Sequence, residues 1–233
     1  MTIHSGPGRD EEGVTREAFR PMPHPGFQFE EAEDRRVLVV SGLRLIFSKA
    51  GARWSHALAI GDGREPVAAS FEGDPHRDSP TRVVSPAYQE IQPHDVEGGA
   101  RWLLTGQSSP HHFSAVVTVR AIEDAIAIEF DVADRCRAPI EALAATYQLP
   151  LGPGALIDAS SERIVWQANA WGKLEFSAGP GTSFALAEAG RQATRVQALA
   201  RLVPTAFTHR LIYHWRWSPP DPSPIPGADT WIS

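Results

Sequence analysis

The sequence has a single cysteine, Cys136, among its 233 residues. One cysteine excludes an intramolecular disulfide and a zinc site built from several thiolates. The segment DRCRAP places Arg135 and Arg137 on either side of this thiol, and neighbouring guanidinium groups can favour a reactive thiolate. No histidine lies close to Cys136 in the sequence, so a catalytic thiol is a minor alternative to an incidental cysteine.

Long apolar runs are also absent, and none approaches the ~20 residues that a membrane-spanning helix needs. The first residues, MTIHSGPGRDEEG, lack the pattern of a secretory signal. Lysine is scarce, and the formal charge of -6 is not offset by any Lys/Arg cluster of the kind that binds nucleic acid. We therefore predict a cytoplasmic protein with no membrane or nucleic-acid partner, whose ligand is a small molecule, a carbohydrate or a protein.

Standard catalytic motifs are missing as well. The sequence contains no phosphate-binding P-loop, dinucleotide-binding glycine motif, H-E-x-x-H or G-x-S-x-G. The glycine-rich segment 151–160 is read as a turn, because Pro153 removes a backbone donor that a phosphate would need. His111 and His112 are consecutive, and neighbouring residues of a strand point to opposite faces, so the two rings cannot readily share a metal. No metal site and no cofactor is predicted.

The organisation of the chain follows from its composition. Hydrophobic residues make up 42% and charged residues 21%, which is enough apolar material for a sizeable core. Residues 1–25 have almost no apolar spacing and predict a flexible lead-in. Residues 218–233 are proline-rich and cannot continue a paired strand. We expect one domain over residues 26–217, because no repeat or linker interrupts it.

Period-two alternation of apolar and polar residues predicts strands throughout this domain. HFSAVVTVR (112–120) and DAIAIEFDV (124–132) alternate clearly, and the short link between them predicts an antiparallel hairpin. About a dozen such segments predict an all-β fold, a large antiparallel two-sheet β-sandwich with few or no helices. Two segments, 138–148 and 184–193, are rich in Ala, Glu and Leu and could instead begin as short helices.

The segment FTHRLIYHWRW (207–217) separates into two alternating sets. One set is apolar or aromatic and predicts the core face, with His209 as a hydrogen-bonded core histidine. The other set faces outward or into a cleft. The core set is Phe207, His209, Leu211, Tyr213, Trp215 and Trp217, and the outward set is Thr208, Arg210, Ile212, His214 and Arg216.

The polar sides of several strands hold the candidate functional residues. A solvated sheet face explains them without any function, but Glu and His together also suit general acid–base chemistry. The candidate acid–base residues are Glu90, Glu129 and His214. The candidate substrate-binding residues are Tyr88, Arg120, Trp171 and Arg210, with Arg210 orienting a carboxylate or hydroxyl and Trp171 offering an apolar platform at a turn.

The succession SPAYQEIQPHD, RWLLTG and the long run 112–150 ending in QLP resembles the galactose mutarotase-like supersandwich domains, over about residues 35–217. The resemblance implies a broad sheet that binds saccharide and, in the mutarotases, a His acid with a Glu base. The motifs around that pair are not recognisable here, so Glu90, Glu129 and His214 rest on chemistry and face alone.

The expected function is carbohydrate binding or processing, with an epimerase/mutarotase-like or lyase-like activity. Two alternatives stay open: a non-catalytic interaction or structural domain, and an enzyme dependent on Cys136 or on a metal. A saccharide is the expected ligand, and a homodimer is compatible because edge strands can pair between subunits. A saccharide site predicts that Glu90, Glu129, Arg210 and His214 converge within ~10 Å in one cleft.

Overall fold

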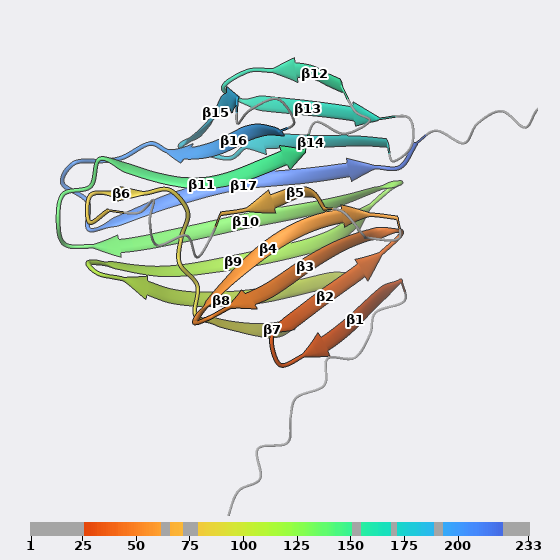
Figure 1. Ribbon diagram of the computed structural model, residues 1–233, viewed down its shortest axis with the longest axis horizontal. Helices are drawn as coiled ribbons and strands as arrows, with labels where there is room; N and C mark the ends of the chain where they lie inside the picture. Colours follow the sequence, from red (N-terminus) through yellow and green to blue (C-terminus); the bar gives the residue numbers. More distant parts are fainter. Residues whose placement is uncertain are drawn as a thin grey trace, which may run out of the picture.

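The computed structural model describes residues 26–61, 66–71, 79–150, 155–168, 172–188 and 193–220. The regular secondary structure within these ranges consists entirely of strands. They form two large sheets that pack face to face (Figure 1). The predicted all-β, two-sheet sandwich is therefore confirmed. The predicted lead-in and most of the predicted C-terminal tail lie outside the described residues.

The larger sheet has nine strands in the order β1-β2-β3-β4-β5-β11-β16-β15, with β6 paired to β11. All its pairs are antiparallel except β6 with β11. Its strands are β1 (Phe27–Ala32), β2 (Arg35–Val40), β3 (Leu43–Ala50), β4 (Arg53–Ile60), β5 (Pro66–Ser70), β6 (Arg82–Val83), β11 (Ala142–Pro150), β15 (Thr182–Glu188) and β16 (Ala193–Ala200).

The eight-stranded sheet has the order β12-β13-β14-β17-β10-β9-β8-β7 and is antiparallel throughout. Its strands are β7 (Glu90–Val96), β8 (Gly99–Ser108), β9 (His111–Ile122), β10 (Ala125–Cys136), β12 (Ala155–Ala159), β13 (Arg163–Ala168), β14 (Gly172–Ala178) and β17 (Thr208–Ser218).

The predicted hairpin is formed by β9 and β10, joined through Glu123 and Asp124. Glu123 has a φ of 54°, the left-handed conformation that a tight turn requires. From 111 to 119 on β9 and along β10, every second residue is buried between the sheets, as Val119 and its partner Ile128 illustrate. The alternation therefore predicted both the strands and their inward face correctly.

Both segments with ambiguous composition contain strands, β11 and β15. In β11 the consecutive residues 143–147 are all buried, because a second layer of chain covers its outer face. There the Thr146 amide donates a hydrogen bond to Ser85 Oγ (2.9 Å), and the Thr146 hydroxyl donates to the Val84 carbonyl (2.7 Å). A strand buried on both faces loses the alternation that would distinguish it from a helix. The structure also corrects one prediction: residues 155–159, read as part of a turn, form β12.

The centre of the core is an aromatic cluster that joins the two sheets. Trp215 of β17 lies edge-on to Tyr147 of β11, with 4.7 Å between ring centroids, and 5.0 Å from Phe130 of β10. His56 of β4 lies 2.8 Å through Nε2 from the Tyr147 hydroxyl, which also hydrogen-bonds Tyr213. Burial lowers the pKa of His56 from its ordinary 6.5 to about 3, so its ring is neutral in the folded protein at neutral pH.

Strand β17 confirms most of the core face predicted for 207–217. His209, Leu211, Tyr213, Trp215 and Trp217 are buried between the sheets. The prediction that Phe207 faces the core is wrong, because its side chain is 66% exposed. Strand β17 begins only at Thr208, and the Phe207 carbonyl accepts a hydrogen bond from the Cys136 amide at the very end of the sheet, where the alternation no longer places a side chain between the two layers.

Candidate functional site

A row of polar side chains crosses the outer face of the eight-stranded sheet, the face turned away from the other sheet. Strand pairing sets its register, with Glu129 of β10 directly opposite His214 of β17 on one side and Thr118 of β9 on the other. The row continues through three further strands by the same pairing. We call this set the polar row: His94, Arg101, Thr118, Glu129, His214 and Ser177.

Glu129 and His214 form the centre of the polar row. Glu129 Oε2 lies 3.4 Å from His214 Nε2, and the side chains are 53% and 36% exposed, respectively. The pair is therefore accessible to a ligand while each side chain restricts the orientation of the other. A carboxylate next to an imidazole can accept, hold and return protons near neutral pH. The structure brings together two of the three predicted acid–base residues.

The neighbouring part of the row is covered by an arginine. Arg101 of β8 directs Nε toward Thr118 Oγ1 at 3.4 Å, and Thr118 is buried although it lies on the outer face. The burial of Thr118 shows that the Arg101 side chain packs over the sheet at this position. The polar row is thus an ordered surface next to Glu129.

Two further arginines lie beside the Glu129–His214 pair. Arg120 of β9 and Arg216 of β17 both pair in register with Ala127 of β10. The small side chain of Ala127 therefore lies between two exposed arginine side chains. Each is a diagonal cross-strand neighbour of Glu129, at about 7–8 Å between Cα atoms. Arg120, predicted to bind substrate, is therefore adjacent to the acid–base pair.

Arg210 is held by a carboxylate. Its Nε lies 2.7 Å from Asp131 Oδ1 and its Nη2 lies 2.5 Å from Asp131 Oδ2, a bidentate ion pair. The hydrogen bonds to Asp131, and then its charge, raise the pKa of Arg210 above its usual range. Arg210 lies four residues from His214 along β17, about 14 Å at the rise of a strand. It flanks the acid–base pair without contacting it.

Glu90 does not join this group. It lies on β7, where Thr105 Oγ1 donates to Glu90 Oε2 at 3.1 Å. Three strand spacings and four residues separate Glu90 from Glu129, which places them about 20 Å apart. The prediction that Glu90, Glu129, Arg210 and His214 converge within ~10 Å in one cleft is therefore wrong, because strand order and register spread them over one sheet face.

The prediction that Tyr88 shares the polar face with Glu90 is also wrong, because Tyr88 is buried in the core. Strand β7 begins at Glu90, and Tyr88 precedes it in an isolated bridge to Trp54 of the other sheet. The Tyr88 carbonyl accepts from the Trp54 amide at 2.8 Å. The chain passes from one sheet to the other here, so the alternation does not extend back to Tyr88. Trp171 lies outside the described residues.

The thiol and the paired histidines also have defined places. Cys136 is buried, with its thiol 3.4 Å from the Ala138 carbonyl, so a substrate has no access to it. His111, opposite Cys136 in register, points inward, while His112 is exposed on the outer face, which confirms that the two rings diverge. Among the described residues no group of three or more His, Cys, Asp or Glu side chains could hold a metal ion.

Sequence reasoning missed a buried contact between a histidine and a carboxylate at this end of the sheet. His111 Nδ1 lies 2.8 Å from Asp134 Oδ2, and both side chains are almost completely buried. His111 Nε2 lies 3.2 Å from the Pro80 carbonyl, and His209 lies directly across from Asp134 on β17. The alternation of apolar and polar residues along β9, β10 and β17 could have predicted this contact, because it turns His111, Asp134 and His209 toward the same inner face of the sheet.

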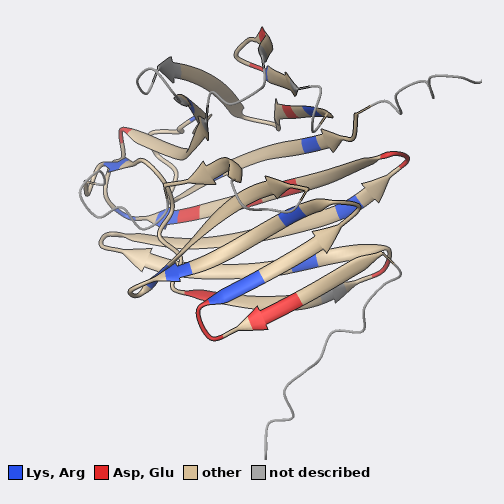
Figure 2. Cartoon of the chain, turned by 45° about the vertical axis from the view of Figure 1, so that its right-hand side comes forward, with Lys and Arg blue, Asp and Glu red and all other residues tan. Residues whose placement is uncertain are grey.

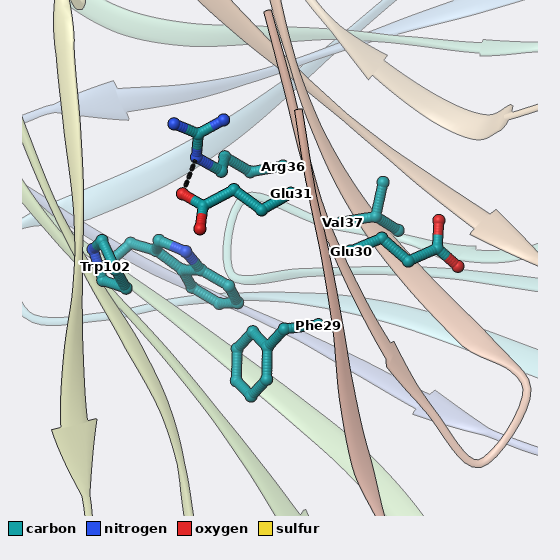
Figure 3. A pocket seen from close by; sticks show the side chains of 7 residues that line it. Phe29, Glu30, Glu31, Arg36, Val37 and Trp102 are labelled. Atoms are coloured by element: carbon teal, nitrogen blue, oxygen red, sulfur yellow. Dashed lines mark ion pairs between the residues drawn. The ribbon is translucent and has the colours of Figure 1, made fainter. Parts of the chain in front are cut away.

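A separate shallow hollow opens between the first hairpin of the nine-stranded sheet and strand β8 (Figure 3). Phe29 and Trp102 form its apolar wall, with 5.9 Å between their ring centroids. Arg36 and Glu31 form an ion pair of 2.5 Å at its rim. None of the predicted site residues lines this hollow.

Charged residues are interspersed over the strands rather than gathered in one region, in the view of Figure 2. Within the described ranges no helix is long and apolar enough to cross a membrane.

Comparisons with known proteins find only low similarity. No protein-family model and no curated protein matches the chain. Among solved structures, the Slr1438 protein from Synechocystis sp. PCC 6803 is similar with a TM-score of 0.40 and 12% identity, covering 89% of this chain and 99% of that one. A 4-alpha-glucanotransferase from Thermococcus litoralis is similar with a TM-score of 0.37 and 10% identity, covering 80% of this chain and 40% of that enzyme. At these TM-scores, neither structure assigns a function to the chain.

Proposed function

We propose that the outer face of the eight-stranded sheet binds a saccharide, with Glu129 and His214 as its acid–base pair. The observation that supports this proposal is the contact of 3.4 Å between the two side chains in the middle of the polar row. Saccharide hydroxyl groups both donate and accept hydrogen bonds, and the row presents carboxylate, imidazole, guanidinium and hydroxyl groups in adjacent positions. A ligand lying across the strands would meet several of them at once.

The two arginines beside the pair extend this surface. Arg120 and Arg216 stand on either side of Ala127, and neither forms an ion pair with another residue of the described ranges. Their guanidinium groups would donate to ring hydroxyls or to the carboxylate of an acidic sugar. Arg210, already neutralised by Asp131, would contribute hydrogen bonds rather than net charge.

The finer proposal is exchange between the two anomers of a sugar. The anomeric hydroxyl oxygen and the ring oxygen are bonded to the same carbon, so two catalytic groups in contact can serve both. Glu129 would take the proton from the anomeric hydroxyl while protonated His214 gives a proton to the ring oxygen, so that the ring C–O bond breaks and a carbonyl forms. After rotation about the bond to the carbonyl carbon, the ring would close on the other face: Glu129 would return its proton to the carbonyl oxygen, and His214 would take back the proton of the hydroxyl that re-forms the ring.

The test combines binding with catalysis. The chain would be screened by thermal shift against neutral and acidic saccharides, and anomer exchange of freshly dissolved sugars would be followed by polarimetry. We expect stabilisation by a saccharide and accelerated exchange, with the exchange lost in Glu129→Gln and in His214→Asn. Glu162→Gln, an exposed carboxylate in the β12–β13 turn, is the matched control.

The outcomes separate the two parts of the proposal. Stabilisation without exchange would keep the saccharide site and reject the acid–base role of Glu129 and His214. Neither stabilisation nor exchange, in a folded protein, would reject both. Exchange that survives in Glu129→Gln and His214→Asn would place the chemistry elsewhere.

A non-catalytic interaction domain is the second candidate, and a different observation favours it. Strand β12 is the edge of one sheet and β15 the edge of the other, and both carry exposed aliphatic side chains: Leu156, Ile157 and Leu186. An edge strand offers unpaired backbone groups to another chain. Light scattering of the purified protein tests self-association, and Ile157→Lys would abolish a dimer formed through β12 while leaving saccharide binding unchanged.

A further inference from the structure

A second candidate site lies at the end of the eight-stranded sheet where β9 begins and β10 ends. Here an open hollow in the surface is lined by Pro110, His112, Arg135 and Arg137. His112 and Arg135 are directly opposite each other in the strand register, and Arg137 follows one residue after β10 ends. We call this feature the basic hollow.

The positive charge of the basic hollow is not neutralised by the described residues. Arg135 and Arg137 form no ion pair with any of them. The two acidic residues of β10 that lie nearest to them are engaged elsewhere, Asp131 with Arg210 and Asp134 with His111. Uncompensated guanidinium groups thus converge on a hollow although the chain carries a net charge of -6.

The base of the hollow is well fixed. On the inner face, directly behind the exposed pair His112 and Arg135, the buried contact of 2.8 Å between His111 and Asp134 joins β9 to β10. On the other side of Arg135, Thr208 of β17 is its register partner and is exposed, which adds a hydroxyl next to the guanidinium. Cationic side chains based on paired strands form a more ordered site than the same groups on a loop.

We propose that the basic hollow binds a compact divalent oxyanion of the phosphate type, either free phosphate or a phosphate monoester. Two guanidinium groups and an imidazole supply several N–H donors, and the planar arginine fork matches the oxygens of a phosphate. The open hollow leaves room for the organic part of an ester. This site is separate from the polar row, because Arg135 lies six positions along β10 from Glu129, a distance of about 20 Å.

The experiment is titration calorimetry of the full chain with inorganic phosphate, and in parallel with phenyl phosphate, at low ionic strength. Low salt is used because screening weakens exposed charge contacts. We expect binding of phosphate that weakens as salt is added, and a fall in affinity of about tenfold or more in Arg135→Gln and Arg137→Gln, since each removes a charge-assisted hydrogen bond. Tighter binding of phenyl phosphate would identify an ester as the ligand, and equal binding would identify phosphate itself.

Arg201→Gln is the control, because Arg201 is exposed, lies outside the hollow and removes the same charge. Arg135→Lys retains the charge but loses the fork, so its affinity should fall between those of the parent and Arg135→Gln. If Arg135→Gln fails to fold by circular dichroism, Arg137→Gln carries the test, because Arg137 lies beyond the end of β10. Absence of phosphate binding, or equal binding by Arg137→Gln and Arg201→Gln, overturns the proposal. Neutral saccharides do not probe this site, so its failure and that of the polar row are distinguishable.

Discussion

The two faces of the eight-stranded sheet differ most clearly at His214 and Trp215, which are consecutive residues of β17. Trp215 points inward, where its ring contacts Tyr147 and Phe130, and is almost completely buried. His214 points outward to Glu129 and is 36% exposed. Alternate residues of one strand therefore differ in their surroundings. The inward residues pack in the core of the sandwich, and the outward residues place titratable side chains on the outer face.

The largest expected effect tests this division directly. Trp215→Ala should lower the free energy of unfolding by about 3–5 kcal/mol, because it opens a cavity in the aromatic cluster. His214→Ala should lower it by less than about 1 kcal/mol, because an exposed ion pair contributes little. Urea unfolding at neutral pH measures both. Similar losses in the two variants would show that the outer face also carries the stability of the sheet.

An effect of similar size should appear at the buried His111–Asp134 pair. His111→Leu leaves the Asp134 carboxylate buried without its partner, and losing one member of such a pair costs about 3–5 kcal/mol. The double variant His111→Leu/Asp134→Leu should recover much of that loss, since no charge then remains buried. Denaturant unfolding of the single and double variants gives the coupling. A double variant no more stable than His111→Leu would contradict this account.

A smaller effect concerns the pH dependence of stability. The pKa of His56 is lowered by burial to about 3, against 6.5 for an ordinary histidine. As the pH falls from 6.5 toward 3, the unfolded chain binds a proton at His56 that the folded chain does not, so stability decreases. The contribution reaches about 1.4 kcal/mol per pH unit for one full proton.

His56→Phe should remove that contribution, because phenylalanine does not titrate and can still stack on Phe130. The free energy of unfolding of both proteins would be measured through the same acidic range, where all other titrating groups are shared. The variant's stability should fall less steeply with decreasing pH. If the free energies of unfolding of the two proteins fall in parallel with decreasing pH, His56 does not contribute to the loss of stability in acid.

The smallest expected change in stability is at the proposed site itself. Glu129→Gln should alter the free energy of unfolding by less than about 1 kcal/mol, because both members of the pair are substantially exposed. Thermal unfolding measures this, and the same sample would be used for anomer exchange. A large loss of stability would make any loss of activity uninformative, and would assign Glu129 a structural role.

Much of the fold could be predicted from the sequence because alternation is a local property. Strands β9, β10 and β17 were predicted with their inward faces, since apolar and polar residues alternate clearly along each of them. Strand β11 was ambiguous, because its residues are buried on both faces and its composition resembles that of a helix. Tyr88 and Phe207 were placed on the wrong face, because each lies just outside a strand whose alternation was extended one or two residues too far.

The candidate site was predicted only in part. Glu129 and His214 were selected by residue type and face, but their contact depends on the pairing of β10 with β17, whose residues are far apart in the sequence. The same pairing brings Arg210 into an ion pair with Asp131. The strand order places Glu90 on the edge strand β7, away from Glu129. The basic hollow was not predicted, although Arg135 and Arg137 had been noted as neighbours of Cys136.

By itself the sequence determined the fold class and the direction of individual side chains, because a strand turns successive residues to opposite faces wherever it lies. Only the tertiary structure decided which outward residues meet. That decision depends on the order and register of strands, and a shift of one residue in register would change every partner. Whether Arg135 lies near His112, or Glu129 near His214, is therefore a property of the assembled sheet and not of any segment within it.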